Sequence, residues 1–270
     1  MEAGAWGRVR DDRERRVKPN SVQGAQSFSR SMAVLQLVAD HASGPTAIDL
    51  AAKTDLTRPT LYRILASLES EGLIQQKPDK RYVLGSRLIG LAHRALAQQD
   101  VRALAHDPLM ALRDETGETV HLAVRNLDAM VYIDKFESPE LVRMASTIGT
   151  QVPFHTSSVG KAYLAALPED EAEALVERLD LAPLTARSVT DREVLLDRVR
   201  AARRLGYSSD EEENESGIVC FGAAILDSAG RPVASVSVSV PDFRLNPDRG
   251  AYWRPLRAQV AAISRNLGHR

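Results

Sequence analysis

The chain of 270 residues contains a single cysteine, Cys220. A lone cysteine excludes an internal disulfide, and no other Cys or His stands near it at the spacing of a zinc site. The six histidines are scattered and form no H-E-x-x-H pattern. We therefore expect neither a metal nor a cofactor. We expect Cys220 to serve in packing as a small buried hydrophobe, in contact with a ligand, or through the reactivity of its thiol.

Long apolar runs and an excess of one charge are also absent. No apolar stretch approaches the ~20 residues that cross a bilayer, and the N-terminus mixes arginines with acidic residues and has no apolar signal segment. We expect a cytoplasmic protein with no membrane contact. The formal net charge is -1, with 13 basic and 10 acidic residues in 1–85 against 22 and 26 in 86–270. This charge distribution agrees with a first part that faces DNA, but by itself it does not establish DNA binding.

Length and composition predict two globular domains of the α+β class. Apolar residues make up 44% of the chain and charged residues 26%, which is ordinary for a folded protein. The hydrophobic period and the turn residues suggest four parts. These are a flexible tail at 1–22, a winged helix-turn-helix at 23–85, linker helices at 86–116 and a second domain at 117–270. A role of the charged tail in touching DNA phosphates stays open.

Three helices and a hairpin are expected in the first domain. Apolar residues recur at helical spacing from Ser29 to His41, and Thr46 can cap a second helix at 47–54. Thr57 can cap a third helix with Pro59 in its first turn, where a missing N–H costs nothing. Residues 73–76 and 81–84 flank a Lys-Pro-Asp-Lys turn, which predicts a two-stranded wing with a basic tip.

The third helix has the chemistry of a DNA reader. Its apolar side chains fall on one face, which leaves a polar face free, and a major groove admits one such helix while a wing adds phosphate contacts. The candidate DNA-binding residues are Thr57, Arg58, Thr60, Tyr62, Arg63, Lys77, Lys80 and Arg81. Winged helices also serve as protein-binding modules, so the alternative is a ligand sensor whose N-terminal module binds a protein partner.

The remaining chain alternates between strand and helix patterns. Helices are expected at 87–98 and 101–115, the second kinked or broken at Pro108. We expect the first of them to pair with its copy in a second subunit, because it carries more apolar surface than one domain needs. Strands follow at 119–125, 129–136 and 142–146, helices at 158–167, 169–179 and 191–205, strands at 207–210, 219–226 and 233–240, and a helix at 252–267. The set predicts an antiparallel sheet with packed helices.

The last strand has a polar face. The period of two places Ser235, Ser237 and Ser239 on one face and three valines on the other. From this pattern alone, the serine face meets either solvent or a ligand.

Three segments carry a resemblance to a known family. The segment AIDLAAKTDLTRPTLYRILASLESEGLIQQKPDKRYVL from Ala47 resembles the DNA-binding domain of IclR-type (isocitrate lyase regulator) transcription factors. The segments VPFHTSSVGKAYLA from Val152, GYSSDEEENESGIVC from Gly206 and AAILDSAGRPVASVSVSVP from Ala223 resemble that family's effector domain. The resemblance spans roughly Phe28 to the C-terminus, with its motifs in the family's order. Asp55 and Ala224 depart from it, standing where the family often has Gly and Pro.

The resemblance implies a fold, a function and a set of partners. The fold is a winged helix-turn-helix joined by a helical linker to a GAF-like effector-binding domain with an antiparallel sheet. The function is DNA-binding transcription regulation controlled by a small molecule, most often repression of a neighbouring catabolic operon. The partners are double-stranded, roughly palindromic operator DNA, a small effector such as an organic or aromatic acid, and further copies of the chain in a homodimer or tetramer.

The resemblance also implies an effector site. Its residues are Asp210, Cys220, Ser237 and Ser239, closed by backbone groups of Ser158 and Val159. Candidates for its apolar wall are Met144, Val152 and Val142. An ionised Asp210 would repel a carboxylate unless it is protonated or bridged by water.

Patterns typical of enzymes are incomplete. Gly160-Lys161 is reminiscent of a phosphate-binding loop, but His155 and Ala162 stand where that loop requires Gly and Ser or Thr. Ser158 and Lys161 match S-x-x-K, but neither S-D-N nor K-T-G occurs. We expect no enzymatic activity, and we interpret His121 and His155 as structural or site-lining residues.

Overall fold

The computed structural model describes residues 26–97, 100–141 and 144–269, so the tail expected at 1–22 and the candidate Val142 lie outside the described residues. The chain divides into two compact units between Ala95 and Leu96. In the part of the chain that the structure describes, no helix is both long and apolar enough to cross a membrane.

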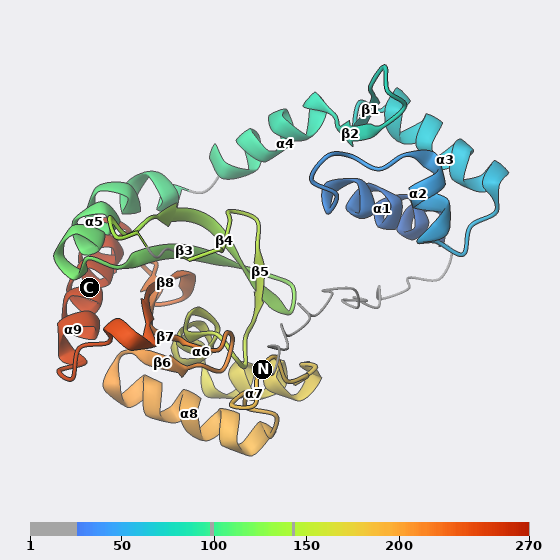
Figure 1. The fold of residues 1–270 in the computed structure, drawn as a ribbon. Coiled ribbons are helices and arrows are strands. Elements are labelled where there is room, and N and C mark those ends of the chain that lie inside the picture. Colours follow the sequence, from blue (N-terminus) through green and yellow to red (C-terminus); the bar gives the residue numbers. More distant parts are fainter. Residues whose placement is uncertain (1–25, 98–99, 142–143, 270) are drawn as a thin grey trace, which may run out of the picture. The chain divides into compact units, whose positions relative to one another are not determined.

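The N-terminal unit is built from three short helices and a two-stranded wing (Figure 1). Its elements are α1 (Gln26–Ala39), α2 (Ala47–Ala52), α3 (Arg58–Ser70), β1 (Ile74–Gln76) and β2 (Tyr82–Leu84), followed by α4 (Ser86–Ala97). Thr46 caps α2 as expected, because its hydroxyl accepts from the Asp49 N–H at 3.3 Å while the Asp49 carboxylate accepts from the Thr46 N–H at 2.8 Å. The apolar face of α3 packs into a core with α1 and the wing.

One local expectation for this unit needs correction. Thr57 stands at the start of α3 with extended backbone, but its hydroxyl bonds to that of Thr60 at 2.9 Å and caps no backbone N–H. Asp55 does not take a left-handed backbone, whereas Lys80 at the wing tip does, with φ of 66°. The turn before α3 therefore needs no special residue at position 55.

The C-terminal unit is built around one antiparallel sheet in the order β5-β4-β3-β8-β7-β6. Its strands are β3 (Thr119–Asn126), β4 (Ala129–Phe136), β5 (Gln151–Pro153), β6 (Ser208–Glu211), β7 (Ile218–Leu226) and β8 (Pro232–Pro241). Its helices are α5 (Asp100–Thr116), α6 (Ser158–Ala166), α7 (Glu169–Arg178), α8 (Arg192–Leu205) and α9 (Gly250–Asn266), with a short 3-10 turn at Asp242–Arg244.

Two expectations fail in this unit. The strand expected at 142–146 is wrong for the described residues 144–146, and the edge strand is instead β5, which pairs with β4. Helix α5 also runs through Pro108, so the break expected there is wrong, and a kink at Pro108 stays a prediction. Of the two helices expected to join the halves, α5 packs into the C-terminal core through Ala105, Leu109 and Leu112.

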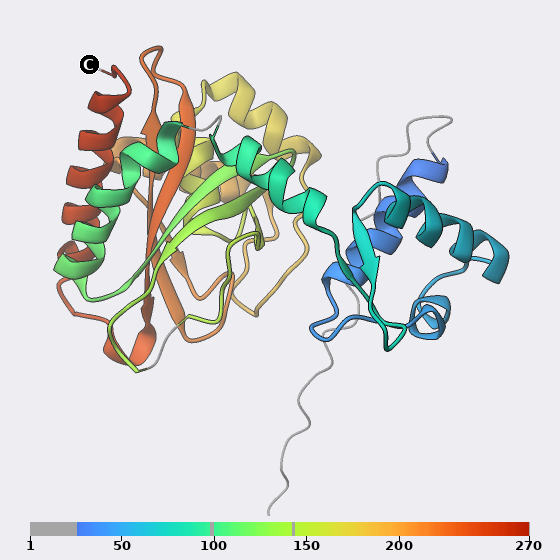
Figure 2. The same cartoon turned by 90° about the horizontal axis from the view of Figure 1, so that it is seen from above.

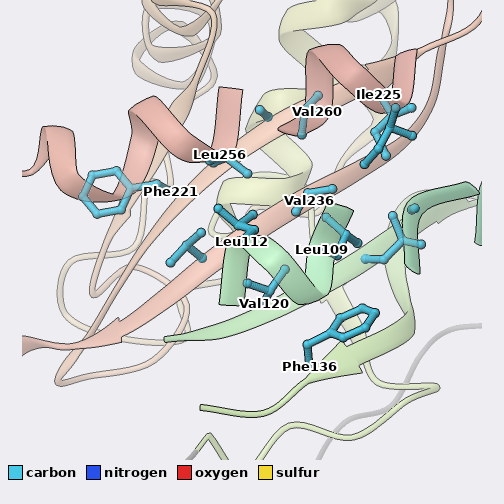
Figure 3. Packing of buried hydrophobic residues seen from close by; sticks show 14 of the residues in the cluster. Leu109, Leu112, Val120, Phe136, Phe221, Ile225, Val236, Leu256 and Val260 are labelled. Atoms are coloured by element: carbon cyan, nitrogen blue, oxygen red, sulfur yellow. The ribbon is translucent and has the colours of Figure 1, made fainter. Parts of the chain in front are cut away.

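The sheet separates two hydrophobic layers. Helices α5 and α9 cover one face, where the valines of β8 meet side chains such as Leu109, Leu256 and Val260 (Figure 3). Helices α6, α7 and α8 lie on the opposite side of the sheet, as the turned view makes clear (Figure 2). A second cluster of buried side chains, from α6, α7, α8, β4 and β5, fills that side. Since adjacent residues of β8 point to opposite faces, its serines face this second layer.

Candidate functional site

Cross-strand register gathers the predicted effector residues into two rows on one sheet face. In the first row Asp210 pairs with Cys220, which pairs with Ser239. In the second row Ser237 pairs with Gly222 on one side and with His121 on the other. Paired residues of an antiparallel ladder share a face, so side chains from four strands meet here. The resemblance implied Asp210, Cys220, Ser237 and Ser239, and the register brings them together on one face.

Ser239 already has hydrogen-bond partners within the protein. Its hydroxyl lies 3.3 Å from the Cys220 thiol, which donates to it, and 3.4 Å from Nδ1 of His121. The other ring nitrogen of His121 lies 2.7 Å from the Ser146 hydroxyl, and the ring stacks on Tyr132 at 4.3 Å. Burial lowers the pKa of His121 to about 3 and raises that of the Cys220 thiol. The imidazole is therefore neutral near pH 7.

Two other serines of β8 have unmet hydrogen-bonding capacity. Ser235 is 0% exposed and Ser237 1% exposed, and neither hydroxyl oxygen has a hydrogen-bond partner among the residues that the structure describes. Buried hydroxyls are nearly always paired, so each exception requires an explanation. Alternation along the strand placed both serines on one face, and only the resemblance indicated that the start of α6 covers this face.

The start of α6 lies directly on this face. The Ser157 hydroxyl caps the helix by accepting from the Gly160 N–H at 3.1 Å. The Ser158 carbonyl accepts from the Ser208 hydroxyl at 2.6 Å, and a Cβ on Gly222 would lie 2.5 Å from that carbonyl oxygen. Gly222 thus lets the helix N-terminus approach the sheet beside Ser237. The first N–H groups of a helix have no partner within it, and they favour an anion.

Asp210 is buried and has a structural task as well. Its Oδ1 accepts from the backbone N–H of Glu213 at 2.7 Å and of Asn214 at 3.3 Å, so the carboxyl shapes the loop after β6. Burial raises its pKa to about 7, although the nearby Lys161 charge and these two hydrogen bonds oppose that rise. A carboxyl with this pKa is protonated in a large fraction of molecules near neutral pH, which reduces its repulsion of an acid.

Sequence reasoning missed an ion pair beside the site. Lys161 and Glu213 are each 1% exposed, and Nζ of Lys161 lies 2.5 Å from Oε2 of Glu213. The guanidinium of Arg198 lies 3.1 Å from the other carboxylate oxygen. Burial lowers the pKa of Lys161, and the Glu213 charge acts against that effect. Lys161 belongs to the Gly-Lys-Ala segment that partly matched two enzyme motifs. The sequence feature that could have indicated a buried ion pair was a lysine within an otherwise apolar helix.

The candidates for the apolar wall lie in different surroundings. The side chains of Val152 and Val159 are buried in the second cluster with Tyr132. Met144 is half-buried, and its carbonyl accepts from Nζ of Lys135 at 2.8 Å. Among the described residues no group of three His, Cys, Asp or Glu side chains is arranged to hold a metal ion.

The candidate DNA-binding residues lie on the polar surface of the N-terminal unit. Exposed side chains include Thr57, Arg58, Tyr62, Arg63, Lys77 and Lys80, and Thr60 is half-buried. Arg81 has another contact, because its guanidinium donates to the Gly44 carbonyl at 2.8 Å and lies 3.8 Å from the Asp79 carboxylate. Arg81 therefore ties the wing to the loop after α1, and a phosphate contact by it stays a prediction.

Family models match both units. The IclR helix-turn-helix domain matches residues 27–78, and the bacterial transcriptional regulator IclR C-terminal domain matches residues 93–265. The chain belongs to the IclR family of bacterial transcriptional regulators. This result confirms the resemblance and the predicted α+β fold of a helix-turn-helix followed by an effector domain.

Two repressors of the family support the same conclusion. The chain is 32% identical over 255 residues to the HTH-type transcriptional repressor AllR of Klebsiella pneumoniae, covering 93% of each chain. It is also 32% identical over 243 residues to AllR of Escherichia coli K12, covering 89% of each.

Solved IclR structures share the fold. The Thermotoga maritima IclR is 33% identical with a TM-score of 0.73, covering 90% of this chain and 99% of that one. An IclR homolog from Microbacterium hydrocarbonoxydans, complexed with 4-hydroxybenzoate, has a TM-score of 0.76 over 89% and 98% of the two chains. At 23% identity it shows the fold alone.

Proposed function

We propose that this IclR-family protein is a repressor whose operator binding is controlled by a small-molecule effector. The observation that carries the proposal is the covered polar face, where Asp210, Cys220, Ser237 and Ser239 meet beneath the N-terminus of α6. A sheet face buried only for packing would be apolar, as the opposite face is. Repression follows the names of the AllR relatives.

The DNA contacts are assigned to α3 and the wing. Arg58, Thr60 and Arg63 suit base edges and phosphates, while Lys77 and Lys80 suit phosphates. The alternative is that the polar face of α3 binds a protein. The buried apolar face of α3 is compatible with both partners and does not distinguish DNA from protein. Salt separates them, because each phosphate contact releases condensed counterions and gives DNA binding a steep salt dependence.

The effector is assigned to the class of small organic or aromatic acids. The 4-hydroxybenzoate bound by the Microbacterium homolog belongs to this class. The free N–H groups at the start of α6, from Ser158 and Val159, suit a carboxylate. Ser237, Ser239 and Cys220 then contact the ligand, and Asp210 accommodates an acid in its protonated form. Met144 and Val152 remain candidates for apolar contacts.

Assembly and setting complete the proposal. Half-sites of a roughly palindromic operator require a two-fold homodimer, either alone or within a tetramer. Residues 86–116 then link DNA binding to the effector domain. The target is a neighbouring catabolic operon, and the protein acts in the cytoplasm.

The DNA assignment is tested with a double variant. Arg58→Ala with Arg63→Ala should weaken binding to a fragment upstream of the protein's own gene at least tenfold in a gel-shift series, because two base or phosphate contacts are lost. Arg204→Ala, an exposed arginine of α8, is the matched control and should bind as the wild type does. Equal binding by the double variant and the control would refute the role of α3. Binding that does not respond to salt would favour a protein partner.

A further inference from the structure

The serine row of β8 contains more unmet hydrogen-bonding capacity than the family resemblance assigns. The resemblance stops at Ser237 and Ser239, but the hydroxyl of Ser239 is already paired with Cys220 and His121. Among the described residues, the buried serine hydroxyls without a hydrogen-bond partner are those of Ser235 and Ser237. The unsatisfied hydroxyls are therefore those of Ser237 and of Ser235, which lies two residues earlier on the same face of the strand.

Small neighbours surround Ser235 on the same face. It pairs with Ala224 of β7 and with Ala123 of β3, and Gly222 stands beside Ser237 in the next row. None of these neighbours offers a side-chain donor or acceptor to the hydroxyl. A methyl group at position 235 would suit an apolar packing role equally well and would avoid the cost of burying an unpaired hydroxyl.

The spacing of the two serines limits what can satisfy them. Residues two apart on a strand are about 7 Å apart along one face, and a hydroxyl bonds an oxygen at about 2.8 Å. One ligand oxygen therefore does not reach both hydroxyls, whereas two polar groups on one small molecule do. The proposed carboxylate position near the start of α6 uses Ser237, which leaves Ser235 for a second group.

We propose that Ser235 is a specificity-determining residue of the effector site, and that the effector is an acid with a second hydrogen-bonding group, such as a hydroxyl or another carboxyl. This inference rests on the proposed function. The second group bonds the Ser235 hydroxyl, and an acid without such a group leaves that hydroxyl buried and unpaired. The site thus selects against simple apolar-tailed acids.

The test uses matched pairs of acids on the full-length protein. The probes are hexanoate with adipate, and benzoate with 4-hydroxybenzoate, each titrated by calorimetry into the wild type and into Ser235→Ala. We expect the wild type to bind at least one bifunctional acid about five- to 150-fold more tightly than its partner, since an unpaired buried group costs that much. Ser235→Ala should reduce that preference to less than twofold.

A second measurement needs no ligand. Ser235→Ala should raise the Tm of the ligand-free protein, because it removes a buried hydroxyl without a partner. Ser264→Ala is the matched control, because the Ser264 hydroxyl donates to the Val260 carbonyl at 2.9 Å and accepts from the Leu226 N–H at 3.0 Å. The control should lower the Tm and leave the acid preference unchanged.

The outcomes separate this inference from the proposed function. If Ser235→Ala keeps the wild-type preference, or lowers the Tm as the control does, its hydroxyl is satisfied by structure or water and the inference is wrong. If no bifunctional acid is preferred by the wild type, the inference is also wrong. In either case a loss of acid binding in Ser237→Ala would still uphold the proposed effector site. Binding that is unchanged in both variants would overturn the site itself.

Discussion

Lys161 and Glu213 illustrate how single residues shape the effector domain. Both charges are nearly inaccessible to water, and Glu213 belongs to the loop that Asp210 holds in place. Burying two charges gains little net stability, but leaving one of them alone is costly. The pair therefore fixes α6 against the loop after β6, next to the serine face.

Removing one partner of this pair should be strongly destabilising. We expect Lys161→Met to lower the free energy of unfolding by about 3 to 5 kcal/mol in urea titrations, because Glu213 stays buried without its main partner. The double variant Lys161→Met with Glu213→Gln should recover part of that loss. A single variant that loses less than about 1 kcal/mol would show that water reaches the pair.

Asp210 predicts a particular dependence of stability on pH. Its pKa of about 7 in the folded chain lies above its ordinary value, so the folded state holds the proton more tightly. Stability from this group is full at low pH and declines as the pH rises from about 4 to about 7, by at most about 1.4 kcal/mol per pH unit. His121, with a pKa of about 3, acts in the opposite direction below pH 6.5.

Asp210→Asn isolates the contribution of Asp210. The amide oxygen can still accept from the N–H groups of Glu213 and Asn214, but the site no longer ionises. We expect the free energy of unfolding of the variant, relative to wild type, to increase between pH 4 and pH 7 and to level off above. Parallel pH profiles for the two proteins would contradict the raised pKa.

At the scale of elements, periodicity predicted helices and strands well where one face is apolar. The apolar faces of α3 and β8 gave their positions, and Thr46 gave the start of α2. Periodicity failed where strand pairing determines which residues form a strand. The apolar residues near 142–146 suggested a strand, but β5 forms at 151–153 because Val152 reaches Met130 across the ladder.

The candidate site was predictable only in part for the same reason. Alternation along β8 placed its serines on one face, and the resemblance supplied Asp210 and Cys220. The register with β3 and the position of α6 on the sheet decide which hydroxyls have hydrogen-bond partners. A pattern along the sequence contains neither. The bond between Lys161 and Glu213 joins residues 52 positions apart, beyond any local pattern.

Helix α4 carries the prediction about assembly. Leu88 packs on the N-terminal core, whereas Ile89 is 73% and Leu91 51% exposed, and we propose that these two side chains pair with their copies in a second subunit. Ile89→Asn with Leu91→Asn should shift the protein toward monomer in light scattering at micromolar concentration. Leu205→Asn, which replaces a 52% exposed leucine of α8, is the control and should keep the oligomer. A double variant of unchanged mass would place the interface elsewhere.

At the scale of the whole molecule, regulation requires two sites that lie in different units of the chain. The exposed polar face of α3 is assigned to DNA, and the covered serine face of β8 is assigned to an acid. Regulation requires that the acid bind the DNA-bound and free states with different affinity. Without that difference the two sites would work independently.

The most direct test of this central claim is fluorescence anisotropy of a labelled fragment from upstream of the protein's own gene. It is titrated with wild type and with Ser237→Ala, with and without the acid that raises the wild-type Tm most among the four probes. We expect both proteins to prefer this fragment over a shuffled one and to bind it equally without acid. The acid should then change the dissociation constant of wild type at least fivefold and that of Ser237→Ala less than twofold. An equal response of the two proteins to the acid, or no preference for the fragment, would contradict the account.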